Sequence, residues 1–113
     1  MIRIYHNPRC RKSREGLEIL EASGHSFNIV KYLDEPLTED QLQQIITLLG
    51  IKPIELVRKN EAIWKSDYKG KQLSDKAIIS AMVKHPKLIE RPIVINGHKA
   101  VIGRPPSLIS EIL

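Results

Sequence analysis

The amino-acid sequence predicts an α/β fold in which a four-stranded mixed sheet carries an all-helical insertion between its two halves. Three observations support this prediction. The start of the chain alternates strand, helix and strand patterns, the middle contains only helical patterns, and the end contains a strong hairpin signal followed by a helix. The order of these patterns is also compatible with another kind of α/β sandwich.

The start of the chain is typical of a βαβ unit. Residues 2–6 alternate isoleucine with polar neighbours, as a half-buried strand does. A helix is expected over residues 11–23, because Gly24 stands where a left-handed C-terminal cap belongs. Residues 27–33 are expected to form the second strand. Since a helix connects the two strands, they should be parallel.

The middle of the chain predicts three helices. Thr38 and Gln41 have the spacing of a capping box at the start of the first, and Gly50 ends it. Its apolar stripe recurs at helical spacing, at Leu42, Ile45, Ile46 and Leu49. A short helix is expected over residues 53–59, with proline in its first turn. A third should run from a Ser74 cap to about Lys84, before a His-Pro pair.

The end of the chain predicts a hairpin and a closing helix. Asn96-Gly97 is a strong two-residue turn signal between the apolar segments 92–95 and 99–102. Residues 106–113 are expected to be helical. This order of elements matches a thioredoxin-like sheet of four strands with a helical insertion.

The bulk properties predict one cytoplasmic domain over residues 1–113. The composition is ordinary for a globular protein, with 42% hydrophobic and 27% charged residues. No apolar run approaches the length of a membrane span, and the N-terminus lacks the features of a signal peptide. A single cysteine cannot form an internal disulfide, so the reducing cytosol is the simplest compartment.

The net charge of +5 favours an anionic partner, either nucleic acid or a small oxyanion. Aromatic residues make up only 4%, so a stacking platform for single-stranded nucleic acid is not expected. No cluster of cysteine and histidine predicts a metal site. A solvated surface is the ordinary interpretation for most of the surplus charge, and no nucleic acid, membrane or bound cofactor is expected.

The strongest chemical signal surrounds Cys10. It lies between the first predicted strand and the first predicted helix, where free backbone N–H groups and the helix dipole favour an anion. A dense group of cations flanks it, namely Arg9, Arg11, Lys12 and Arg14. His6 would add positive potential if protonated. Such surroundings should lower the pKa of the thiol. The competing interpretation is a buried, inert cysteine.

Ser13 occupies the position of the second thiol in a Cys-x-x-Cys motif. A dithiol oxidoreductase uses that thiol to resolve its own mixed disulfide. Any disulfide formed by Cys10 must therefore be resolved by a thiol from another molecule.

The chain resembles the glutaredoxin-linked arsenate reductase (ArsC) family, particularly its compact members, over essentially its whole length. Four motifs carry the resemblance in the right order. They are the cysteine loop from Ile4 to Cys10 with Ser13-Arg14, the segment Leu56-Val57-Arg58-Lys59-Asn60, the segment Arg91-Pro92-Ile93-Val94, and Gly103-Arg104-Pro105.

The resemblance implies a thioredoxin-like fold and a reaction. Cys10 attacks arsenate, while Arg58, Arg91 and Arg104 hold the oxyanion and His6 helps to keep the thiolate. Glutathione then attacks the adduct as co-substrate, and glutaredoxin reduces the resulting disulfide. Arginine suits this task, because its planar fork matches oxyanions and stays charged. Taken singly, each of these three arginines could instead be an ordinary surface residue with no role in oxyanion binding. The Arg91–Pro92 peptide bond is expected to be cis.

Two other functions are open. One is a transcriptional regulator similar to the Spx type, which shares this fold and binds RNA polymerase. Ser13 and Arg104 argue against it, because such regulators typically have a Cys-x-x-Cys switch and lack the Gly-Arg-Pro motif. The other is a thiol transferase without arsenate activity, which the sequence does not separate from the reductase.

Overall fold

A computed structural model describes all residues from 1 to 113. The chain forms two compact units, one of residues 1–35 with 91–113 and the other of residues 36–90. The first contains all four strands, and the second is the helical insertion. None of the helices is both long and apolar enough to cross a membrane.

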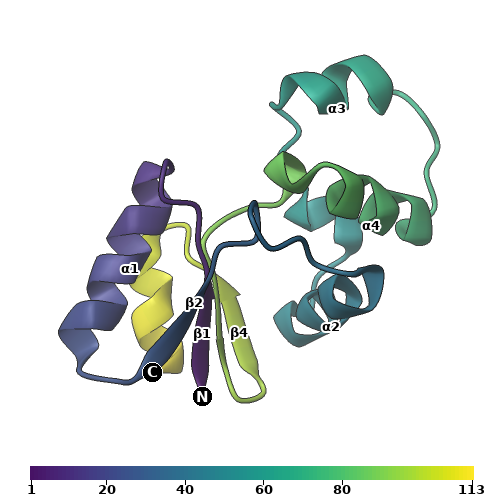
Figure 1. Ribbon diagram of the computed structural model, residues 1–113. Helices are drawn as coiled ribbons and strands as arrows, with labels where there is room; N and C mark the ends of the chain where they lie inside the picture. Colours follow the sequence, from purple (N-terminus) through teal and green to yellow (C-terminus); the bar gives the residue numbers. More distant parts are fainter. The chain divides into compact units, whose positions relative to one another are not determined.

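The sheet of the first unit has the strand order β2-β1-β3-β4 (Figure 1). The strands are β1 (Ile2–Tyr5), β2 (Phe27–Val30), β3 (Ile93–Asn96) and β4 (Lys99–Ile102). β1 runs parallel to β2 and antiparallel to β3, which pairs antiparallel with β4 across the predicted hairpin. The predicted mixed α/β sheet is therefore confirmed.

Two helical segments pack on each other beside this sheet. They are α1 (Arg11–Ser23) and the closing 3-10 helix η3 (Pro106–Ile112), which lie side by side in Figure 1. One face of β1 and β3 meets them in an apolar core of Ile2, Ile4, Leu20, Val94, Ile109 and Ile112. Gly24 caps α1 in the left-handed conformation, with φ of 78°. The core fixes the C-terminal end of β1 relative to the start of α1, where Cys10 lies.

The second unit consists of short helices. They are α2 (Glu39–Leu49), the 3-10 helix η1 (Pro53–Leu56), α3 (Ala62–Asp67), α4 (Asp75–Lys84) and the 3-10 helix η2 (Pro86–Leu88). α4 packs against α2, η1 and η2. The capping box of Thr38 and Gln41 is present, with each side chain bonded to the other's backbone N–H.

Two local predictions differ from the structure, the predicted closing helix is of the 3-10 type, and one helix was not predicted. The second strand ends at Val30 rather than residue 33, because the next residues turn back on the Lys31 carbonyl. The expected helix over 53–59 is only η1, and Val57 instead pairs in a β-bridge with Ile89. The closing segment is a 3-10 helix. No helical pattern in the sequence indicates α3, which is anchored by the buried Trp64.

At Gly16, α1 packs closely against the rest of the first unit. A Cβ at this position would lie 2.9 Å from both Ile109 Cδ1 and Pro92 Cγ. Overpacking of this kind costs about 1–3 kcal/mol, while alanine in a helix returns about 1 kcal/mol. We therefore expect Gly16→Ala to lower the free energy of unfolding by roughly 1 kcal/mol, as measured by urea denaturation. Glu18→Ala, at an exposed position of the same helix, is the control. A Gly16→Ala protein as stable as the wild type would contradict the close packing.

Candidate active site at Cys10

The loop before α1 is a hydrogen-bonded turn that places Cys10 at the start of the helix. The Cys10 N–H donates to the Asn7 carbonyl at 3.0 Å, with Pro8 at the second position of the turn. The Asn7 side chain accepts from the Arg9 N–H, also at 3.0 Å. The Arg14 N–H then donates to the Cys10 carbonyl, which makes Cys10 the N-cap residue of α1. The predicted place of Cys10 at the helix start is confirmed.

The pKa of Cys10 is lowered from its ordinary value. Burial of the half-exposed thiol opposes this shift by favouring the neutral form. The Ser13 backbone N–H, the Arg91 side chain and the Lys12 backbone N–H together outweigh burial, because each favours the thiolate. Backbone groups of the first helical turn and one distant arginine therefore create the anion site.

Arg91 lies beside this cysteine, and Arg104 contacts the backbone of Arg91. Arg91 hydrogen-bonds the sulfur of Cys10 and adds its positive charge. The Gly103 N–H donates to the Pro92 carbonyl at 2.8 Å, which brings the next residue back toward Arg91. Arg104 Nη1 then donates to the Arg91 carbonyl at 3.2 Å. The Arg91–Pro92 peptide bond is cis as predicted, and the Arg104–Pro105 bond is also cis.

His6 is buried and bonded to Ser13. Its Nδ1 lies 2.7 Å from Ser13 Oγ, and the Asn7 N–H donates to the same hydroxyl oxygen at 3.0 Å. Burial and the nearby charge of Lys31 lower the pKa of His6. The imidazole is therefore neutral at neutral pH, and the positive potential that a protonated His6 would supply is absent. His6 acts on the loop through the Ser13 hydroxyl.

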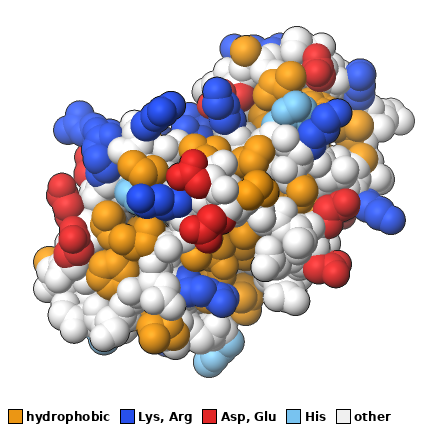
Figure 2. All heavy atoms as spheres, in the orientation of Figure 1, with side chains coloured by type: hydrophobic (Ala, Val, Ile, Leu, Met, Phe, Trp, Pro, Cys, Tyr) orange, Lys and Arg blue, Asp and Glu red, His pale blue; other side chains and the backbone are white.

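The cation cluster around the cysteine differs from the expectation. All four side chains are exposed, and Figure 2 shows Lys and Arg side chains gathered over the N-terminal part of α1. Arg11 and Lys12 share Glu15, at 3.1 and 3.8 Å. Solvent screens such charges strongly, so the guanidinium of Arg91 influences Cys10 more than its sequence neighbours do.

Arg58 belongs to the second unit and is held by two carboxylates. Its Nη1 lies 3.3 Å from Glu90 Oε1, and its Nε lies 3.5 Å from Glu61 Oε1. The family resemblance implies an oxyanion ligand at Arg58, but it does not indicate these two partners. An ion pair between Arg58 and Glu61 is predictable from their spacing of three residues, whereas Glu90 is distant in sequence.

Ser13 was also underestimated. The sequence indicates only that it replaces a resolving cysteine. In the structure its side chain is completely buried and joins His6 to the Asn7 backbone, while its own N–H favours the Cys10 thiolate. In the sequence, a small polar residue among four cations is the only hint of this role.

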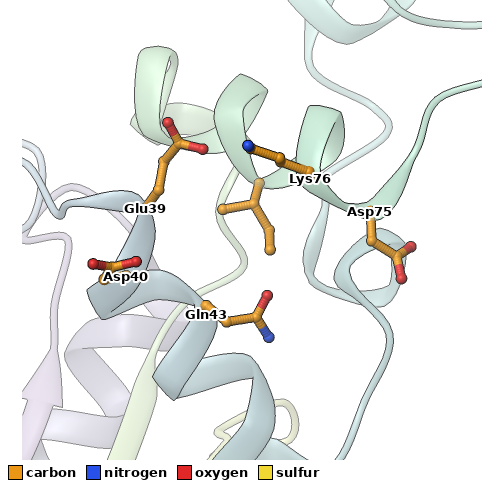
Figure 3. Close-up of a pocket in the computed structure, with 6 residues that line it drawn as sticks. Glu39, Asp40, Gln43, Asp75 and Lys76 are labelled. Atoms are coloured by element: carbon orange, nitrogen blue, oxygen red, sulfur yellow. The ribbon is translucent and has the colours of Figure 1, made fainter.

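A separate hollow lies between α2 and α4 in the second unit (Figure 3). Its volume is about 380 Å³, and it is lined by Glu39, Asp40, Gln43, Asp75, Lys76 and Ile79. None of the predicted site residues lines it. With three carboxylates against one lysine, it does not suit an oxyanion.

The lowered pKa of Cys10 predicts a measurable reactivity. We expect the rate of alkylation by iodoacetamide to rise with pH through a midpoint below the value of about 8.5 for a free thiol. Mass spectrometry of the alkylated protein over a pH series measures that midpoint, with N-acetylcysteine as the reference thiol. A midpoint equal to or above the reference would support the inert, structural cysteine.

The fold and this geometry define a thioredoxin-like α/β protein built around one cysteine of lowered pKa. Residues 5–112 match the ArsC family, and the chain belongs to that family. It is 45% identical to a protein named arsenate reductase from Haemophilus influenzae, with 97% of each chain covered. It is 44% identical to the uncharacterized protein YfgD of Escherichia coli, covering 99% of this chain and 96% of that one.

Solved structures agree with this assignment. An arsenate reductase from Vibrio cholerae superposes with a TM-score of 0.95 and 43% identity, covering 99% of this chain and 97% of that one. The thioredoxin-like fold expected from the sequence is therefore confirmed.

Proposed function

We propose that this protein reduces arsenate to arsenite through a thiol–arsenate adduct on Cys10. The observation that carries the proposal is the bond from Arg91 to the sulfur of a cysteine with lowered pKa. An arginine beside a thiolate can also bind the oxyanion that the thiolate attacks, because the guanidinium has five N–H donors. Relatives named arsenate reductase support arsenate as the oxyanion.

In the first step, the Cys10 thiolate attacks arsenic, and an arsenate oxygen leaves as water after protonation. The side chains of Arg91, Arg104 and Arg58 are proposed to bind the remaining oxygens and to stabilise the negative charge that develops on them. His6 is proposed to act indirectly, by holding Ser13 and thereby the helix N-terminus against the thiolate.

In the second step, a thiol from another molecule must complete the reduction, because Ser13 replaces a resolving cysteine. We propose glutathione for this role. Arsenic gains two electrons as arsenite leaves, while the Cys10 thiol and the glutathione thiol each lose one and form a mixed disulfide. Glutaredoxin then reduces this disulfide, which returns Cys10 to the thiol.

A coupled assay tests this function. Purified protein is mixed with glutathione, glutathione reductase and glutaredoxin, and NADPH oxidation is followed with and without arsenate. We expect oxidation that depends on both arsenate and the protein. If Cys10 proves to be a low-pKa thiol but turnover is independent of arsenate, a thiol transferase becomes the better assignment.

A further inference from the structure

Arg58 lies on a short two-stranded ladder inside the helical insertion. The Arg58 N–H donates to the Leu88 carbonyl at 2.7 Å, and the Glu90 N–H donates to the Leu56 carbonyl at 2.9 Å. Between these bonds, Val57 and Ile89 form an antiparallel bridge. Arg58 and Glu90 are therefore diagonal neighbours on one side of the ladder, where long side chains reach each other. The backbone itself fixes this pair.

Glu61, three residues after Arg58 in the sequence, contacts the same guanidinium. It is the N-cap residue of α3, but its carboxylate makes no capping hydrogen bond. The carboxylate instead lies 3.5 Å from Arg58 Nε, while its backbone N–H donates to the Arg58 carbonyl at 3.2 Å. The absence of a side-chain cap is consistent with the carboxylate facing the arginine.

The three side chains form a half-buried cluster with more negative than positive charge. The exposed fractions are 24% for Arg58, 27% for Glu61 and 26% for Glu90. A partly buried cation without a partner is costly, so the two carboxylates stabilise Arg58 when no anion is present. The same carboxylates repel any oxyanion that reaches the guanidinium, and partial burial limits screening by salt.

We propose that Glu90 and Glu61 set the anion affinity of Arg58, because an oxyanion binds this guanidinium in competition with them. This proposal rests on the oxyanion-binding role of Arg58 in the proposed function. The carboxylates keep the Arg58 side chain in place between turnovers. They also lower its affinity for the anion, so that the product can dissociate. Glu90 is the stronger competitor, since it alone forms a hydrogen bond with the guanidinium.

Glu90→Gln separates competition from positioning. Glutamine keeps an oxygen that accepts the hydrogen bond from Arg58 Nη1, but it removes the negative charge. We expect the Kd for sulfate and for arsenate to fall roughly three- to tenfold in Glu90→Gln, and by a smaller factor in Glu61→Gln. Isothermal titration calorimetry at constant ionic strength measures both constants. In arsenate turnover, the KM should fall by a similar factor with a smaller change in kcat.

Two controls isolate the effect. Glu39→Gln removes the same charge from an exposed position of α2 and should leave Kd unchanged. In an Arg58→Ala background, Glu90→Gln should no longer tighten anion binding, because the competition needs the guanidinium. Urea denaturation of each variant verifies that it is folded.

The outcomes distinguish this proposal from the proposed function. Unchanged or weaker anion binding in both glutamine variants would overturn the competition, as would tighter binding that persists without Arg58. Tighter sulfate and arsenate binding in a protein that shows no arsenate-dependent turnover would support the competition at Arg58. The same result would count against arsenate reduction.

Discussion

Cys10→Ser is expected to abolish arsenate reduction. A serine hydroxyl is not ionised near neutral pH and cannot form the thiol adduct, even though Arg91 and the backbone N–H groups would remain in place. The coupled NADPH assay should show no arsenate-dependent rate above the background without enzyme. Alkylation should also be lost, because this is the only cysteine in the chain.

The matched control is Ser13→Ala, three residues later in the same loop. Its hydroxyl joins His6 to the Asn7 backbone, so its loss should reduce activity by loosening the loop. Activity should persist, however, because Ser13 does not take part in resolving a disulfide. Substantial arsenate-dependent turnover by Cys10→Ser would show that another group attacks arsenate.

Local signals predicted much of the fold correctly. These signals each specify the backbone conformation of a few residues. They are the capping box of Thr38 and Gln41, the helix-ending Gly24 and Gly50, and the Asn96-Gly97 turn. Each was confirmed because it depends only on the backbone conformation of a few neighbouring residues. The short 3-10 segments and α3 depend on tertiary contacts instead. Trp64, for example, becomes an anchor only once the insertion is packed.

The candidate site shows the same division. The placement of Cys10 at the start of α1 is a local property, and the sequence predicted it. The cation that hydrogen-bonds its sulfur is not local, because Arg91 is 81 positions later in the chain. Sequence proximity therefore favoured the adjacent exposed cations. Only the resemblance to a family identified Arg91 and Arg104 as site residues, and no pattern identified Glu90 as a partner of Arg58.

Arg91→Ala is expected to impair two properties of the site at once. The side chain both hydrogen-bonds Cys10 and adds positive charge, so its removal should raise the pKa of the thiol. It should also remove a charge-assisted hydrogen bond to the oxyanion, which contributes on the order of 1.5–3 kcal/mol. The expected loss in kcat/KM is therefore roughly tenfold to hundredfold. The alkylation midpoint and the coupled assay measure the two effects separately.

Arg91→Lys distinguishes charge from geometry. An ammonium keeps the positive charge near Cys10, so the alkylation midpoint should return most of the way toward that of the wild type. It lacks the planar fork, so kcat/KM should recover poorly. Arg3→Ala, at an exposed position of β1, controls for the loss of one arginine and should change neither quantity. If Arg91→Lys restores kcat/KM as fully as it restores the midpoint, Arg91 acts through its charge on Cys10, and the planar fork of this arginine is not needed to bind arsenate.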